Sequence, residues 1–133
     1  MTFTTACVGA VLLLCSLVLS PAWAVDLGVE KIAAQITARS ASRNVFKIED
    51  IHQRMQSAIN CLVGPKGEGF DAAAPNPCAA SGNGLIPDSD PAKKDRYMEV
   101  VAKLQTGIAT TERSAAMQIA LDAADTIVSI SDE

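Results

Sequence analysis

The sequence predicts an all-α protein, either an antiparallel bundle of short helices or a hairpin of two long ones. Two regions, residues 28–63 and 91–130, place apolar residues three and four positions apart, the spacing that gathers them on one face of a helix. Residues 64–90 between them are rich in glycine and proline, which interrupt regular structure. No run alternates apolar and polar residues over the length of a strand, so we expect essentially no β-sheet.

Residues 1–24 have the pattern of a signal peptide. The stretch ACVGAVLLLCSLVL is uncharged and too short to span a bilayer comfortably. The tripeptide AWA then supplies the small-x-small motif of a signal peptidase site, which predicts cleavage before Val25. Because the first five residues include no Lys or Arg, an uncleaved membrane anchor is the alternative. We therefore expect residues 25–133 to form a single helical domain in the periplasm or outside the cell.

The charged residues all follow the predicted signal peptide, so the mature domain keeps the formal net charge of −4. A negative protein is not attracted to nucleic acid or to anionic membranes. Acidic and basic residues are interspersed along the chain, and they form no block that would mark an electrostatic patch. We expect no nucleic-acid partner, and no membrane association after signal cleavage.

The first helical region, residues 28–63, contains no proline and, after Gly28, no glycine. Two apolar sets recur at helical spacing, and we expect both to face the core. They are Val29, Ile32, Ala33 and Ile36, and then Ile48, Ile51, Met55, Ala58, Ile59 and Leu62. The polar segment RSASRN at 39–44 separates them. It is either a turn between two helices or the exposed middle of one.

The loop at 64–90 is expected to be ordered. Loops of this length are uncommon and are usually functional or disordered. This one contains three apolar side chains, Phe70, Leu85 and Ile86, which we expect to anchor it against the helices. It also contains Cys78, which pairs with Cys61 if the exported chain is oxidised. We predict a structural disulfide. A redox-active pair is the alternative, although catalytic dithiols usually occur as C-x-x-C.

The second helical region begins with Asp90 as a cap and Pro91 in the first helical position. Gly107 and the two threonines at 110–111 fall between two halves of its stripe. The stripe consists of Tyr97, Val101, Leu104 and Ile108, and then Ala115, Ile119, Ala123, Thr126 and Ile130. If each region splits in two, four helices cover their stripes within one chain. Two long helices would leave apolar faces open and would form a homodimer. We favour the bundle.

The loop resembles a pattern found in small exported bacterial proteins of unassigned function. The shared stretch reads NCLVGPKGEGFDAAAPNPC and is followed by GNGLIPD. The residues that carry the resemblance are Asn60-Cys61, Gly64-Pro65, Phe70, Asn76-Pro77-Cys78, Gly82-Asn83-Gly84 and Pro87-Asp88. It covers about a fifth of the chain and implies only an exported helical protein with a disulfide loop.

Sequence signatures of catalysis and of cofactor binding are absent. The chain has no C-x-x-C-H haem motif, no H-E-x-x-H and no phosphate-binding G-x-x-x-x-G-K-[ST]. A zinc site or a Ser-His-Asp triad would have to use the single histidine, His52, without the neighbouring motifs that such sites require. We predict no catalytic residue and no cofactor.

Our functional prediction is a non-catalytic exported accessory or binding protein, whose partner is a protein or a small ligand. The alternative is a periplasmic metal-handling protein for copper or haem. It would use His52 and Met55, which share a helix face, together with Met98 and Met117, because thioethers favour Cu(I). Met55 also fits the apolar stripe as a core residue.

Overall fold

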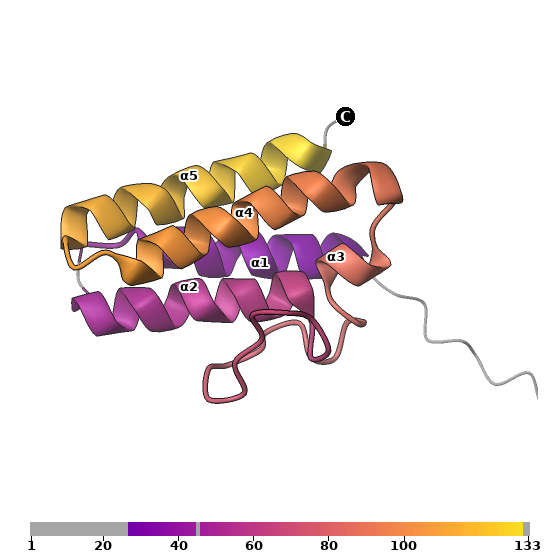
Figure 1. Ribbon diagram of the computed structural model, residues 1–133, viewed down its shortest axis with the longest axis horizontal. Helices are drawn as coiled ribbons and strands as arrows, with labels where there is room; N and C mark the ends of the chain where they lie inside the picture. Colours follow the sequence, from indigo (N-terminus) through magenta and orange to yellow (C-terminus); the bar gives the residue numbers. More distant parts are fainter. Residues whose placement is uncertain (1–26, 45, 132–133) are drawn as a thin grey trace, which may run out of the picture.

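Four long helices pack side by side, and a one-turn helix lies within the loop that joins the two pairs (Figure 1). The computed structural model describes residues 27–44 and 46–131, so the predicted signal peptide and its cleavage site lie outside the described residues. The helices are α1 (Leu27–Ala41), α2 (Ile48–Val63), α3 (Leu85–Asp88), α4 (Pro91–Ala109) and α5 (Arg113–Ser131). The described chain contains no strand, which confirms the all-α prediction.

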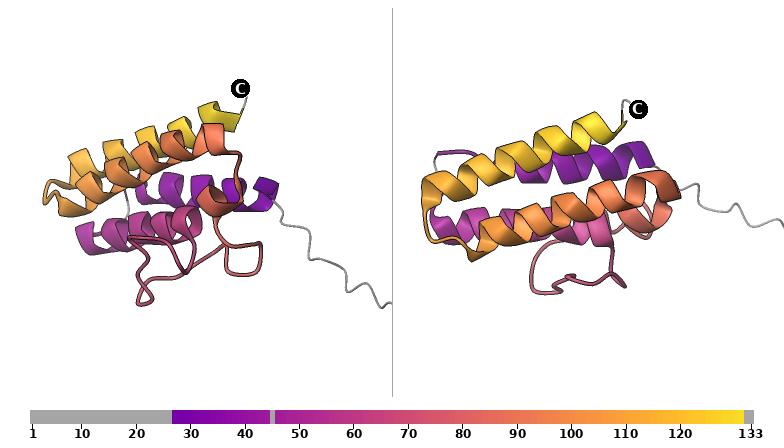
Figure 2. Two further views of the ribbon diagram at one scale, coloured as in Figure 1. Left: turned by 45° about the vertical axis from the view of Figure 1, so that its right-hand side comes forward. Right: turned by 45° about the horizontal axis from the view of Figure 1, so that its top comes forward.

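Each predicted helical region is divided into two antiparallel helices. α1 packs against α2 and α5, and α4 also packs against both of these helices. The two pairs therefore form an up-down-up-down bundle, and the views in Figure 2 agree on this arrangement. The bundle rather than the long hairpin is the observed architecture. In the part of the chain that the structure describes, no helix is both long and apolar enough to cross a bilayer.

The stripes predicted for α2 and α4 do face the core. Ile51, Met55, Ile59 and Leu62 of α2 are fully buried. They meet the buried stripe of α4, which consists of Tyr97, Val100, Val101 and Leu104. In α5 the buried face is turned slightly from the predicted one, because Ala115 is exposed while Ala116, Ala120 and Ile127 are buried.

The buried face of α1 differs in part from the predicted one, and the side chains of Val29 and Ile36 lie outside those that the structure describes. The helix buries Glu30, Ala34, Ala38 and Ala41. Of the predicted set, Ile32 is 53% exposed, whereas Ala33 is partly buried against the core. The physical reason is that α1 sits between α2 and α5, where small side chains allow helices to approach closely.

Candidate functional site

A stapled loop, residues 64–84, projects from the bundle beside the C-terminal end of α2 (Figure 1). Cys61 in α2 and Cys78 in the loop form a disulfide, with their Cα atoms 5.0 Å apart. Their sulfur atoms lie 3.3 and 3.5 Å from the backbone oxygen of Glu30. These are contacts rather than hydrogen bonds, because oxidised sulfur carries no proton. The disulfide therefore holds the loop against both α1 and α2.

Asn60 is a second attachment point, which sequence reasoning missed. Its side chain is fully buried, and its amide nitrogen donates to the backbone oxygens of Asp71 at 2.8 Å and Ala74 at 3.1 Å. Its amide oxygen accepts from the backbone nitrogen of Asp71 at 2.9 Å and from the Gln56 side chain at 3.1 Å. This one side chain uses both its donors and its acceptor to fix the turn at 71–74.

The two ends of the loop cross at Gly64 and Gly84. Both have positive φ, +70° and +112°. A Cβ atom on Gly64 would lie only 1.6 Å from the backbone oxygen of Asn83. The backbone nitrogen of Gly84 also donates to a carboxylate oxygen of Glu30, at 3.2 Å. Only glycine allows this approach.

The three predicted loop anchors all contact the core. Leu85 is 2% exposed, and Phe70 and Ile86 are partly buried against the core. Leu85 and Ile86 belong to α3, a helical turn where the sequence predicts loop. Asn60 could have been recognised as a further anchor, because it is a polar residue within an apolar run immediately before the loop.

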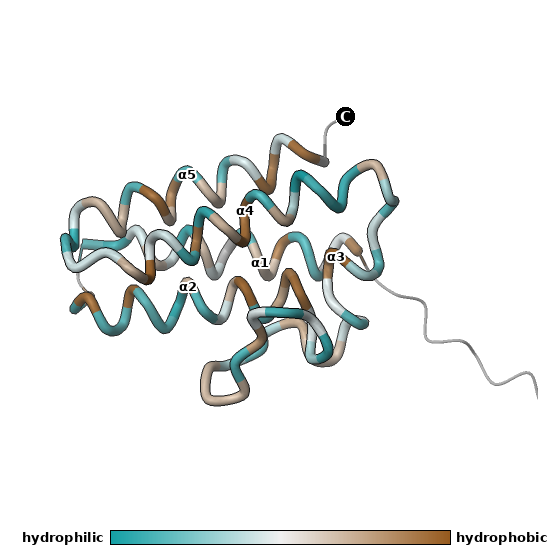
Figure 3. The backbone as a smooth tube through the Cα atoms, viewed as in Figure 1, coloured by the Kyte–Doolittle hydropathy of each residue, from teal (hydrophilic) through white to brown (hydrophobic). Residues whose placement is uncertain are grey.

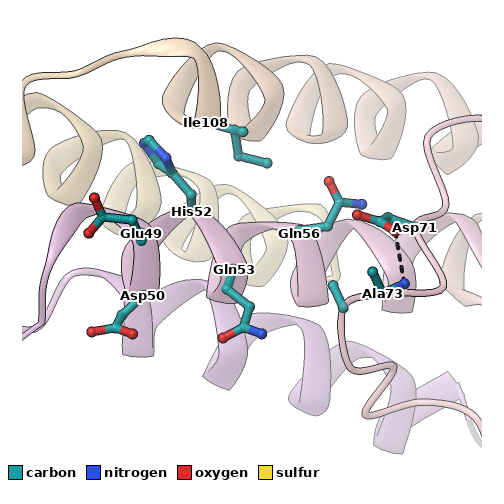
Figure 4. A pocket seen from close by; sticks show the side chains of 9 residues that line it. Glu49, Asp50, His52, Gln53, Gln56, Asp71, Ala73 and Ile108 are labelled. Carbon is teal, nitrogen blue, oxygen red and sulfur yellow. Dashed lines mark hydrogen bonds between the residues drawn. The ribbon is translucent and has the colours of Figure 1, made fainter.

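The loop segment 71–77 lies beside α2 and helps to form two hollows. Both are partly lined by Asp50 and Gln53 of α2. The first hollow, of about 490 Å³, is bounded by Asp71 and Ala73 of the loop and by Ile108 of α4 (Figure 4). The second, of about 380 Å³, is bounded by Pro75 and Pro77 of the loop and by residues of α1 and α2.

Polar groups in the first hollow mainly hold the structure together. The Nε2–H of His52 donates to the backbone oxygen of Thr110 at 3.0 Å, because a carbonyl can only accept. Gln56 donates to the backbone oxygen of Gly69 at 2.8 Å. The Asp71 carboxylate accepts from the backbone nitrogen of Ala73 at 2.8 Å, the contact dashed in Figure 4. No nucleophile and base are paired among these groups.

The structure does not gather His52 and the methionines into one site. Met55 is fully buried, with its sulfur next to Gly107. Met98 is 44% exposed and precedes Gly107 by nine positions in α4, about 13 Å along the helix axis. Met117 lines a different hollow from His52. The described residues also include no group of three or more His, Cys, Asp and Glu side chains that could hold a metal ion.

Arg54 is the ordered cation of the second hollow. Its guanidinium carbon lies 4.1 Å from the centroid of the Phe46 ring, within the range of a cation–π contact. Its Nη1 donates to the hydroxyl of Ser40 in α1 at 3.1 Å. The guanidinium is therefore held on one side by an aromatic ring and on another by α1.

Comparisons with protein-family models, with curated proteins and with solved structures find no match to this chain. Function therefore has to be inferred from the site itself.

Proposed function

We propose that this chain is a non-catalytic binding protein of an oxidising compartment, and that the stapled loop is its contact surface. The observation that carries the proposal is the way the loop is held. A disulfide, a buried asparagine and a glycine crossing fix a segment that has almost no regular structure of its own. Long ordered loops on a rigid scaffold commonly carry binding functions.

The exposed side of the loop suits a protein partner. Its solvent-facing side chains include six that are small or apolar: Ala72, Ala73, Pro75, Pro77, Ala79 and Ala80. Figure 3 shows mildly hydrophobic colouring at the end of the loop farthest from the helices. Because the backbone of the loop is already fixed, the loop loses little conformational entropy when a partner docks on it.

Photo-crosslinking in the cell that makes the protein tests the contact surface. A photoreactive phenylalanine analogue placed at Ala73 or Ala79 of the loop should give a discrete covalent adduct. The matched controls are Ala115 and Gln118, which are exposed on α5, and these should give none. Equal labelling from α5, or no adduct from either loop position, would contradict the proposal.

The compartment is supported separately by the disulfide and by the apolar segment that precedes the domain, since disulfides persist in exported proteins. Intact mass of the exported protein should match a chain that starts at Val25. A mature species that retains Met1 would contradict signal cleavage without bearing on the contact surface.

A further inference from the structure

The second hollow beside the loop combines an ordered cation with apolar walls. Phe46, Pro75 and Pro77 line it together with Arg54. Its volume of about 380 Å³ falls within the usual range for small-molecule sites. Pro75 and Pro77 belong to the stapled loop, so the disulfide helps to position one wall of the hollow.

Arg54 keeps most of its hydrogen-bonding capacity. A guanidinium has five N–H donors in a planar fork. Among the described residues, Ser40 is the hydrogen-bond acceptor for Arg54, and no carboxylate forms an ion pair with it. The fork is ordered by Phe46 and Ser40, and most of its N–H groups remain for a ligand.

The other polar groups of the hollow offer few donors. The hydroxyl of Thr37 donates to the backbone oxygen of Ala33 at 2.7 Å. The hydroxyl of Ser57 donates to the backbone oxygen of Gln53 at 3.0 Å. A ligand acceptor would therefore be recognised mainly by Arg54, assisted by the exposed amide side chain of Gln53.

We propose that this hollow binds a carboxylate joined to a compact apolar group. The carboxylate would take the free edge of the Arg54 fork, with which its two oxygens match in geometry. The apolar group would lie against Phe46, Pro75 and Pro77. This inference rests on the proposed function in one respect, that the stapled loop forms part of the contact surface.

A monoanion fits the hollow better than a phosphate dianion. Asp50 also lines the hollow, where one of its oxygens accepts from the backbone nitrogen of Lys47 at 3.3 Å. Its negative charge opposes that of a bound anion, and the repulsion doubles for a dianion. With one arginine and one acid lining the hollow, a ligand of charge −1 is therefore favoured over a ligand of charge −2.

The same chemistry could come from a free organic acid or from the C-terminus of a peptide. Two probes distinguish these sources, phenylacetate and N-acetyl-alanyl-phenylalanine. Each is paired with its neutral amide. The test titrates each probe into the isotopically labelled, disulfide-bonded protein and follows backbone amide shifts by NMR.

We expect saturable shifts at residues lining the second hollow, with each amide binding at least about tenfold more weakly than its acid. Arg54→Gln should weaken acid binding by a similar factor. The matched control is Arg43→Gln, which removes the same charge from an exposed arginine outside the hollow, and it should change affinity less than about twofold. The tighter of the two acids identifies the source of the carboxylate.

A second variant, expected to bind more tightly, keeps the test decisive even if Arg54→Gln fails to fold. Asp50→Asn keeps an oxygen for Lys47 and removes the opposing charge, so acid binding should strengthen about two- to threefold. No gain in Asp50→Asn, equal affinity for acid and amide, or an equal loss in Arg43→Gln would overturn the site. None of these outcomes alters the crosslinking result, so failure of the carboxylate site is distinguishable from failure of the loop as a contact surface.

Discussion

At the scale of single residues, the turn at 71–74 depends on one buried amide. Asn60 bonds to backbone groups of Asp71 and Ala74 in the loop. Without the side chain, those groups lose their partner and must be hydrated instead. Asn60→Ala should lower the free energy of unfolding by roughly 2–3 kcal/mol, as measured by urea denaturation. Gln118→Ala, on the exposed side of α5, is the control and should change it by less than about 0.5 kcal/mol. Equal stability of the two variants would show that the turn is held by packing alone.

Gly84 is a position where a side chain would meet both backbone strain and a backbone clash. Its φ is +112°, and a Cβ atom would lie 2.5 Å from the backbone nitrogen of Gly64. Gly84→Ala should therefore lower the free energy of unfolding by about 2–4 kcal/mol. Gly82→Ala, two positions earlier and outside the left-handed region, should have a clearly smaller effect. If thermal unfolding ranks the two variants in the opposite order, the crossing of Gly64 and Gly84 is wrong.

Some individual contacts could be predicted from the sequence, and others depend on the tertiary fold. Cys61 and Cys78 were predictable because export and an even cysteine number both favour pairing. The burial of Leu85 was predictable because an apolar residue in a polar loop usually packs into the core. The acceptor role of Glu30 was not predictable. Its partner, the backbone nitrogen of Gly84, is 54 residues away in the sequence.

At the scale of elements, the stapled loop is attached to the helices at several points along its length. Asn60 fixes residues 71–74, and Leu85 buries the far end in the core. Between them, Cys78 supplies the connection to α2 and lies against the backbone of α1. The segment 76–82 therefore depends most on the disulfide.

Removing the disulfide should loosen this segment and leave the helices in place. Cys61→Ala combined with Cys78→Ala should lower the free energy of unfolding by roughly 2–4 kcal/mol, because the unfolded chain loses a restraint. Far-UV circular dichroism should retain most of its helical signal, and a broad-specificity protease should cut first within 76–82. If the double variant resists the protease as well as the wild type does, the disulfide is not what orders the segment. Free thiols in the exported protein would restore the redox-active alternative.

Apolar spacing predicted the inward faces of α2 and α4 but not the buried alanines and Glu30 of α1. Large side chains such as Ile59 and Leu104 mark a buried face because they contribute most of the apolar area. Among the described side chains of α1, the buried ones are alanines and Glu30, and alanines contribute little area and suit close helix packing. The larger Ile32 lies mainly in solvent, so at this position hydrophobicity alone does not indicate which side of the helix is buried.

At the scale of the whole molecule, spacing alone could not decide between a bundle and a hairpin. The apolar stripes stay roughly in phase across residues 39–44 and across Gly107, so each region could continue as one helix. Tertiary contacts decide in favour of turns. Arg113 of α5 donates to the backbone oxygens of Asn44 and Phe46, and Arg39 of α1 pairs with Asp125 of α5. The Arg113 contacts join α5 to the turn between α1 and α2, and the ion pair joins α5 to α1, which also pack against each other.

The oligomeric state follows from how completely the closed bundle covers its apolar surface. Two long helices would need a second chain to cover their stripes, whereas the four-helix bundle buries those of α2 and α4 within one chain. The large apolar side chains that remain more than a third exposed, among those described, are Leu27, Ile32 and Met98. Ile32 and Met98 lie on α1 and α4, which are not packed against each other, so they do not form the contiguous patch typical of a stable interface. We therefore predict that sedimentation velocity will give the mass of one mature chain. A dimer would contradict this prediction. Ile32→Glu would then test the outward face of α1 as the interface, because dissociation by this variant, but not by Met98→Glu, would place the contact there.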